Sequence, residues 1–413
     1  MSEKNLESSR WWIAIAAIIM QLSLGTVYAW SVFKKPLMAA HGWGETQTQV
    51  TFMICIFVIG LSAAFGGTLV DKKGPKFVAT IGGILFGIGT LLAGLADQIG
   101  SIWLLYIGFG LIAGLGNGFG YVTPIATLIR WFPDKRGLVT GLAVMGFGLG
   151  AFFMGMIAPR MVIAMGVANT FYTLGIIFLI LVTGAAQVYK NPPQGWLPAG
   201  FKPAASGGVS AADSFTFDRA AKTPQWWMLW LMLFLNISAG LGLLSQLSPM
   251  AQDVIKKAVV GEIPATELAL AGGAILAIAS IFNGLGRLLW AWISDAIGRK
   301  NVFIIMFITQ AVLYVLLPQI GDKLIFTIIA CYLLACYGGG FATMPAFAAD
   351  SFGPAYIGKV YGMMLTAWGL AGVVGPLVFA QLKGIALYVA AGLLIVGFLL
   401  AIAYKKPAVA AKA

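Results

Sequence analysis

Charged residues are scarce in this chain of 413 amino acids. Asp, Glu, Lys and Arg make up 10% of it and hydrophobic residues 60%, whereas a soluble globular domain has about 25% charged residues. So few charges cannot cover the surface of a water-soluble protein of this size. The composition excludes a soluble fold and predicts an integral membrane protein, with about 20 apolar residues in each membrane-spanning helix.

The residues that usually build enzyme centres are also rare. The chain has one histidine, His41, and its three cysteines, Cys55, Cys331 and Cys336, lack the spacing of a zinc or haem motif. It has no Gly-Lys loop that would bind the phosphates of ATP, and neither a nucleophile–base pair nor paired carboxylates. We therefore expect no enzyme, no metal, no bound cofactor and no ATP-driven pump.

Acidic residues are missing from the apolar runs. A buried acid would suit an exporter of cations or drugs, so its absence argues against that class. The same absence leaves no evident carboxylate to carry a proton through the membrane.

Twelve apolar segments are expected to cross the membrane. Each must be helical, because a single apolar run can satisfy its own backbone hydrogen bonds in lipid only as a helix. The predicted spans are Trp11–Phe33, Gln49–Val70, Phe77–Ala96, Ile102–Ile129, Leu138–Ile157, Val167–Tyr189, Trp226–Ser248, Leu268–Ile293, Val302–Leu317, Leu324–Phe347, Val360–Phe379 and Ile385–Tyr404.

A polar stretch, residues 191–224, divides the spans into two sets of six. It contains Pro192-Pro193 and Ser206-Gly207-Gly208, which are typical of a linker. We predict an N-terminal six-helix bundle at 1–190, a cytoplasmic linker at 191–224 and a C-terminal six-helix bundle at 225–413.

The net charge of +12 is interpreted as a topology signal. If the N-terminus is cytoplasmic, most lysines and arginines fall in cytoplasmic segments, as the positive-inside rule requires. We therefore expect both termini in the cytoplasm and no binding of nucleic acid.

The two halves carry repeated motifs. The loop Asp71–Lys76, with the pattern Asp-x-x-Gly-x-Lys, recurs as Asp295–Lys300. Parallel duplication of six helices is typical of secondary transporters. A second set of residues recurs at one constant offset: Pro124, Pro133, Gly137 and Gly141 as Pro345, Pro354, Gly358 and Gly362.

These loops resemble the signature loop of the major facilitator superfamily. Three further segments, Gly25–Ser31, Arg130–Gly137 and Asn191–Trp196, resemble segments of the bacterial oxalate/formate antiporters and their relatives, the monocarboxylate transporters. The resemblance covers the whole chain. It implies an all-α integral membrane fold, with 12 transmembrane helices in two pseudo-symmetric six-helix bundles, and we expect a monomer in the bacterial inner membrane.

One arginine, Arg287, lies deep in the otherwise uncharged span Leu268–Ile293. A charge there costs roughly 2.5–3.5 kcal/mol, and the planar guanidinium matches a carboxylate. We predict that Arg287 binds the carboxylate of an organic anion, the alternative being a structural contact with backbone carbonyls or an aromatic ring. Asn283 lies on the same helical face as Arg287 and could donate a hydrogen bond to the substrate. The eukaryotic monocarboxylate transporters resemble this helix but have an acid at that place.

Four further residues form two pairs at i, i+4 within glycine-rich segments. They are Asn117 with Tyr121 in the fourth span and Tyr337 with Phe341 in the tenth. We predict that both pairs line a substrate cavity; the alternatives are an interhelical hydrogen bond for Asn117 and ordinary packing for the rings. The family resemblance adds Tyr28 of the first span.

Trp368 in the eleventh span bears on the charge of the substrate. Relatives that exchange the dianion oxalate are expected to have a lysine near this position, whereas this segment has no cation. Lys359 lies at the end of the span and is interpreted as an interfacial anchor. One buried cation and a bulky indole favour a monoanion over oxalate.

Charged residues of the loops are predicted to be structural or to gate the transporter. They are Asp71, Asp295, Arg130 and Arg136, which could form ion pairs on the cytoplasmic side. His41 is assigned to an external loop, Lys34–Glu45, rather than to the cavity.

The sequence thus predicts a secondary active transporter of small monocarboxylates, such as L-lactate or pyruvate, that works by alternating access. A proton is the expected coupling ion, and exchange of one anion for another is the alternative. Duplicated halves argue against an anion channel. A membrane sensor that transports nothing is a further alternative that the sequence does not exclude.

Overall fold

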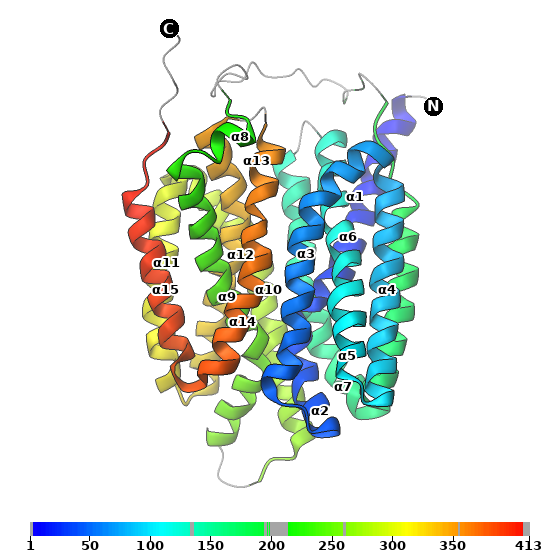
Figure 1. Cartoon of the computed structure of the whole chain (residues 1–413), viewed down its shortest axis with the longest axis vertical. Helices are drawn as coiled ribbons and strands as arrows, with labels where there is room; N and C mark the ends of the chain where they lie inside the picture. The colour runs from blue at the N-terminus through cyan, green and yellow to red at the C-terminus, as the bar shows by residue number, and fades with distance from the viewer. Residues whose placement is uncertain are drawn as a thin grey trace.

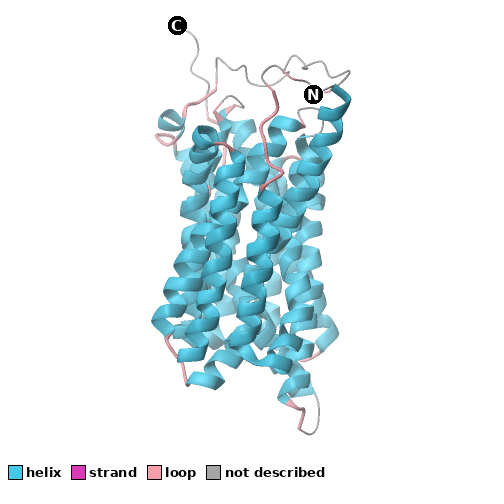
Figure 2. Ribbon diagram, turned by 90° about the vertical axis from the view of Figure 1, so that its right-hand side faces the viewer, coloured by secondary structure: helices cyan, strands magenta, loops and turns pink. Residues whose placement is uncertain are grey.

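The protein is described by a computed structural model that covers residues 3–132, 136–193, 196, 198, 214–258, 262–353 and 356–407. Every regular element in these ranges is a helix, as Figure 2 shows. The elements are α1 (Glu3–Gly25), η1 (Thr26–Ala29), α2 (Trp30–His41), α3 (Glu45–Lys73), α4 (Pro75–Ile99), α5 (Ile102–Leu105), η2 (Tyr106–Ala113), α6 (Gly114–Trp131), α7 (Arg136–Ala186), α8 (Phe217–Ala220), α9 (Pro224–Ala258), α10 (Ala265–Ile297), α11 (Arg299–Leu316), η4 (Leu317–Gln319), α12 (Lys323–Phe352), α13 (Ile357–Met364), α14 (Thr366–Leu382), η5 (Lys383–Ile385) and α15 (Ala386–Ala403).

Ten segments of the described chain are long and apolar enough to cross a membrane. Two of them, Gly141–Ala186 with 46 residues and Lys359–Ala403 with 45, are too long for one crossing, because about 20 residues suffice. The first bends at Gly166, whose φ of 79° and ψ of 172° are not helical. The second turns at η5, where Lys383 has a φ of 37°. Each therefore crosses twice, which gives the twelve predicted crossings.

The helices form two bundles that stand side by side, with both chain termini at the same end (Figure 1). Helices α1 to α7 pack with one another in one bundle, and α9 to α15 in the other. The most extensive contacts between the bundles are made by two helix pairs, α7 with α10 and α3 with α14. We call the end with the termini the terminal end and the opposite one the distal end.

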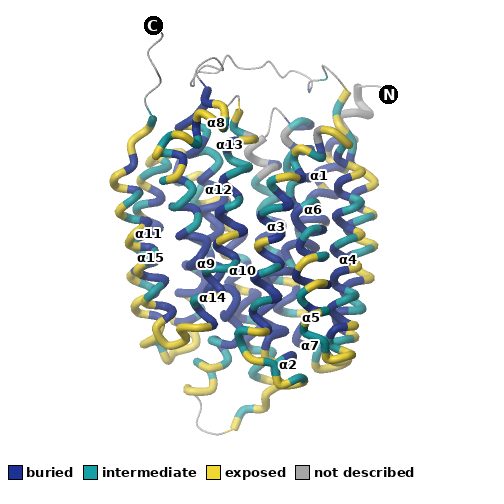
Figure 3. The backbone as a smooth tube through the Cα atoms, in the orientation of Figure 1, coloured by how far each residue is buried: buried dark blue, intermediate teal, exposed yellow. Residues whose placement is uncertain are grey.

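Burial follows the pattern of a membrane protein. Buried backbone lies mainly in the interior helices, and exposed positions follow the outer faces (Figure 3). Large apolar side chains such as Phe65, Trp103 and Trp292 are more than 70% exposed. An apolar outer surface of this kind is stable only against lipid, so the chain is a multi-pass membrane protein.

Glycine lets the helices approach closely where the bundles meet. A Cβ atom added to Gly60 of α3 would lie 2.6 Å from the backbone of Gly369 in α14. No side chain fits that gap, so the two glycines set the closest approach of these helices.

The structure corrects two details of the predicted spans. The predicted loop Lys34–Glu45 is much shorter than expected, because α2 continues to His41 and α3 begins at Glu45, which leaves residues 42–44 as the loop. The predicted first span is also interrupted by the 3₁₀ turn η1. Lys34 pairs with Glu45 at 3.4 Å, so a charged residue is accommodated within α2.

The division of the chain at 1–190, 191–224 and 225–413 stays a prediction. The second part of the linker is described from residue 214 and runs along the C-terminal bundle. There the Phe215 amide donates to the carbonyl of Phe352 at 2.8 Å, and α8 leads into α9 at Pro224.

Candidate functional site

Arg287 lies on the face of α10 that points into the protein. Its side chain is 2% exposed, and its Cζ atom lies 5.2 Å from the ring centre of Phe341 in α12. The Nε and Nη1 atoms have no hydrogen-bond partner, and the buried side chains of the described residues include no Asp or Glu. The guanidinium therefore stacks on an aromatic face but keeps donors and a positive charge available for an anion.

Asn283 lies one helical turn before Arg287 and is fully buried. Neither its amide nitrogen nor its amide oxygen has a hydrogen-bond partner. Leaving a buried polar group unpaired costs roughly 1–3 kcal/mol. Two guanidinium nitrogens of Arg287 and both polar side-chain atoms of Asn283 thus lack a hydrogen-bond partner within the protein.

Glycines on neighbouring helices make room for the side chains of Arg287 and Asn283. A Cβ atom added to Gly338 of α12 would lie 2.6 Å from the Asn283 side-chain oxygen and 3.1 Å from Arg287. A Cβ added to Gly148 of α7 would lie 3.3 Å from the Arg287 Nε atom. The glycines of both bundles therefore let backbone approach the charged group closely.

Six aromatic rings from both bundles form one connected cluster beside Arg287. Phe147 of α7 contacts Tyr28 at 5.1 Å and Tyr121 at 5.0 Å between ring centres. Trp368 of α14 contacts Tyr121 at 5.1 Å and Phe341 at 5.2 Å. All the rings are at most 5% exposed; they are Tyr28, Tyr121, Phe147, Tyr337, Phe341 and Trp368.

A hydrogen bond between two of these rings joins the bundles. The Tyr337 hydroxyl of α12 donates to the Tyr28 hydroxyl of η1 at 2.7 Å. These residues are far apart in the chain and meet only because α12 packs beside the 3₁₀ turn. The structure therefore brings together seven of the eight predicted binding residues around one enclosed centre.

Asn117 is the predicted binding residue with the weakest link to this centre. It is fully buried, and its amide nitrogen donates to the carbonyl of Leu24 at 2.8 Å. This is the interhelical hydrogen bond that was its alternative role. Its amide oxygen has no partner, so one polar atom is still available.

Phe147 was missed by the sequence reasoning. It lies in the stretch Gly146–Gly150, where glycines alternate with large apolar residues. A single large ring between two glycines on a bundle-joining helix is a signal that could have singled it out.

The predicted gating residues lie toward the terminal end. Asp295 forms an ion pair with Arg299, which also lies 3.5 Å from Asp350. Arg130 donates to the Asn191 side chain at 2.9 Å. The side chains of Asp71 and Arg136 lie outside the described residues.

The distal end is closed by contacts that no motif had indicated. The Glu45 carboxylate accepts from Lys34 of its own bundle at 3.4 Å and from Gln246 of the other bundle at 2.8 Å, and it lies 3.9 Å from Lys383. Lys35 pairs across the bundles with Asp253 at 3.2 Å. Glu45 is thus the centre of a polar junction between the two bundles.

Replacing Glu45 by glutamine should loosen this junction. The substitution keeps the shape but removes the charge that holds Lys34 and Lys383. Loss of about 1 kcal/mol at a partly exposed ion pair should raise the open fraction at the distal end roughly fivefold. The measurement is the rate at which a membrane-impermeant thiol reagent labels a cysteine placed at Met250, which lines the cavity beside Glu45.

The matched control is Glu267→Gln, which removes an exposed acid at the start of α10. Its labelling rate should equal that of the parent protein. Equal labelling rates in Glu45→Gln and the parent would show that the junction does not hold the distal end closed.

The fold and the enclosed site can now be compared with known proteins. The family model of the Major Facilitator Superfamily matches residues 12–376, and a further match covers residues 262–412. The chain belongs to the major facilitator superfamily. It is therefore a membrane transporter and not an enzyme.

Individual members of the superfamily give a finer comparison. The oxalate:formate antiporter of Oxalobacter formigenes is 30% identical over 379 residues, which are 90% of this chain and 84% of that protein. Apicoplast pyruvate carrier 1 of Toxoplasma gondii is 26% identical over 359 residues, which are 74% of this chain and 64% of that protein. Both relatives are named for the transport of small carboxylates.

A solved structure supports the fold. The crystal structure of a bacterial homologue of the human lysosomal transporter Spinster superposes with a TM-score of 0.73, covers 96% of each chain and is 13% identical. At this identity the likeness shows the major facilitator fold alone.

Proposed function

We propose that this transporter carries small monocarboxylates and that Arg287 binds the substrate carboxylate. The observation that carries the proposal is a buried guanidinium with two unpaired nitrogens in a centre without acidic side chains. An arginine in this setting needs an anion to compensate its charge. A planar carboxylate matches the guanidinium with two parallel hydrogen bonds.

The charge of the centre favours a monoanion. Arg287 is the cation of the cluster, and the place where oxalate-exchanging relatives are expected to have a lysine holds the fully buried Trp368. A dianion would leave one negative charge uncompensated in a dry site, which is costly. L-lactate, pyruvate and similar acids therefore fit better than oxalate.

The surrounding residues then have distinct roles in the proposal. Asn283, Asn117, Tyr121 and Tyr337 supply hydrogen bonds to the carboxylate or to an oxygen on its neighbouring carbon. The rings of Phe341, Tyr28 and Trp368 surround the short apolar tail. Because these residues come from both bundles, substrate contacts can form fully only when the bundles close around the ligand.

Alternating access follows from the two bundles. Binding of the anion neutralises Arg287 and lowers the cost of enclosing it. The Glu45 junction at the distal end joins the two bundles and would have to break for that end to open. The Asp295–Arg299–Asp350 ion pairs lie within the C-terminal bundle and would hold its helices together near the terminal end. We infer from the positive-inside rule that the terminal end, with both termini, faces the cytoplasm. We propose that the protein is a monomer in the bacterial inner membrane.

We propose that the protein is a proton-coupled symporter driven by the proton gradient, without a cofactor. The proton would accompany the substrate carboxyl group or a water beside Arg287, since the centre lacks a carboxylate of its own. Anion exchange is the second candidate, and the 30% identity to an oxalate:formate antiporter favours it.

Uptake of radiolabelled L-lactate into liposomes distinguishes proton-coupled symport from anion exchange. An inward proton gradient should stimulate saturable uptake, and unlabelled pyruvate should compete. Uptake that ignores the gradient but appears once the vesicles are preloaded with formate or oxalate would replace symport by exchange. No uptake of any small carboxylate under either condition would refute the function.

A further inference from the structure

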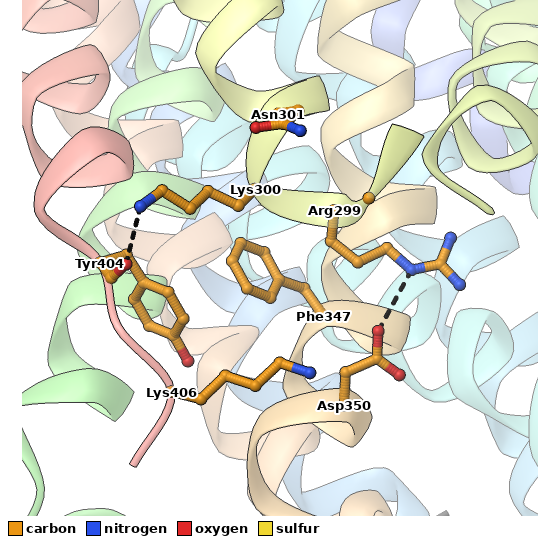
Figure 4. Close-up of a pocket in the computed structure, with 8 residues that line it drawn as sticks. Arg299, Lys300, Asn301, Phe347, Asp350, Tyr404 and Lys406 are labelled. Carbon is orange, nitrogen blue, oxygen red and sulfur yellow. Dashed lines mark hydrogen bonds and ion pairs between the residues drawn. The ribbon is translucent and has the colours of Figure 1, made fainter. Parts of the chain in front are cut away.

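A basic pocket lies at the terminal end, outside the enclosed centre. It has a volume of about 330 Å³ and is formed where the start of α11, the end of α12 and the segment after α15 meet (Figure 4). Arg287 lies roughly 15 Å back along α10, at 1.5 Å per residue. The residues around the pocket are Gly298, Arg299, Lys300, Asn301, Phe347, Asp350, Tyr404 and Lys406.

The pocket carries a net positive charge, because three cations, Arg299, Lys300 and Lys406, stand against two acids, Asp295 and Asp350. Arg299 is compensated by Asp295 and by Asp350. Lys300 donates to the carbonyl oxygens of Ile402 at 2.8 Å and Tyr404 at 3.0 Å, which are neutral acceptors. Lys406 is exposed and makes no hydrogen bond or ion pair with the described residues.

Hydrogen bonds within the protein hold Lys300 of α11 in place. Its ammonium group uses two of its three protons on the last carbonyls of α15, so one proton is left to donate. Figure 4 shows Lys300 on one side of the pocket and Lys406 reaching across it toward Asp350. Two separated ammonium groups around one space suit a ligand with several oxygen acceptors.

The neighbouring hydroxyl adds no negative charge. Burial raises the pKa of Tyr404 to about 12, so this group is neutral at physiological pH. Its hydroxyl donates to the Ser351 hydroxyl at 2.6 Å. The rim of the pocket therefore stays positive across the physiological range.

The pocket borders the surface that faces lipid. Ile305 of α11 is 38% exposed and Ile402 of α15 is 49% exposed, and both lie within a few residues of the pocket, where α11 begins and α15 ends. The lysines thus lie just beyond an apolar outer band, at the depth of the lipid headgroups. Basic pockets between membrane helices at this level bind anionic headgroups.

We propose that this pocket binds a phosphate group through Lys300 and Lys406. A phosphate offers several oxygens to the two ammonium groups. The ligand is the headgroup of an anionic phospholipid or a soluble phosphate, and the two sources share the same contacts. The site is separate from carboxylate binding at Arg287.

The test compares Lys406→Gln with Lys405→Gln in the full-length protein. Lys405 is the adjacent exposed lysine and does not line the pocket. Binding of phosphatidylglycerol in detergent is titrated by native mass spectrometry, with phosphatidylcholine as the neutral lipid. Since a lysine near an anionic lipid is worth about 1 kcal/mol, Lys406→Gln should weaken binding roughly fivefold, and Lys405→Gln should bind as the parent does.

Further measurements distinguish a lipid headgroup from a soluble phosphate and control for misfolding of the variants. Lys300→Gln, checked by its thermal unfolding, should weaken binding to a similar extent. Inorganic phosphate that stabilises the parent without lipid, and does so less in Lys406→Gln, would assign the site to a soluble phosphate. If Lys406→Gln equals the parent both in binding phosphatidylglycerol and in stabilisation by phosphate, or if Lys405→Gln weakens binding equally, the proposal is overturned.

Discussion

Replacing Arg287 by glutamine is expected to abolish saturable uptake. The substitution keeps the length and polarity of the side chain but removes the charge and the two-pronged contact with a carboxylate. Hydrogen bonds to a charged group contribute about 1.5–3 kcal/mol each, so substrate affinity should fall at least about 100-fold. The measurement is the concentration dependence of L-lactate uptake into liposomes.

Arg160→Gln is the matched control for this variant. Arg160 is an exposed arginine of α7, so its loss should leave uptake unchanged. Gel filtration and thermal unfolding should show that Arg287→Gln is folded, because removing a buried charge that no acid compensates also removes its desolvation cost. Normal uptake by a folded Arg287→Gln variant would refute the central role of this residue.

Replacing Asn283 by aspartate is expected to make uptake strongly dependent on pH. The new carboxylate would lie one turn from Arg287 and compete with the substrate for the guanidinium. Above the pKa of the new acid the ion pair forms and uptake falls; below it the acid is neutral and Arg287 is free. Breaking a buried ion pair costs about 3–5 kcal/mol, so uptake should fall on the order of 100-fold to several thousand-fold as pH rises through that pKa.

The profile is measured with equal pH on both sides of the membrane, which removes any effect of a gradient. Asn283→Ala is the control, because it loses the amide without adding a charge. It should lower uptake by a constant factor and retain the parental pH profile. If the aspartate and alanine variants have the same profile, Asn283 does not lie within reach of the group that binds the substrate.

Much of the fold and part of the site could be predicted from residue patterns. A helix in lipid must satisfy its own backbone, so apolar run length alone gave the twelve crossings. A charge that lipid cannot solvate must point inward, which is why Arg287 could be placed in the interior without any knowledge of its neighbours. Helical spacing then put Asn283 on the same face.

Contacts between distant segments could not be predicted in this way. The Tyr337–Tyr28 hydrogen bond and the place of Phe147 between Tyr28 and Tyr121 depend on how α12, η1 and α7 lie against one another. The Glu45 junction was missed because Lys34 and Glu45 looked like loop charges. Their partner Gln246 lies in the other bundle, and no local pattern connects them.

The sequence by itself thus determined that this protein is a duplicated membrane transporter with one interior cation, because lipid imposes simple rules on each helix separately. Only the tertiary structure decided which rings enclose that cation and which residues close the distal end. It also placed Lys300 and Lys406 around one pocket. These features depend on the relative position of two bundles, which glycine contacts such as Gly60 with Gly369 fix across segments far apart in the chain.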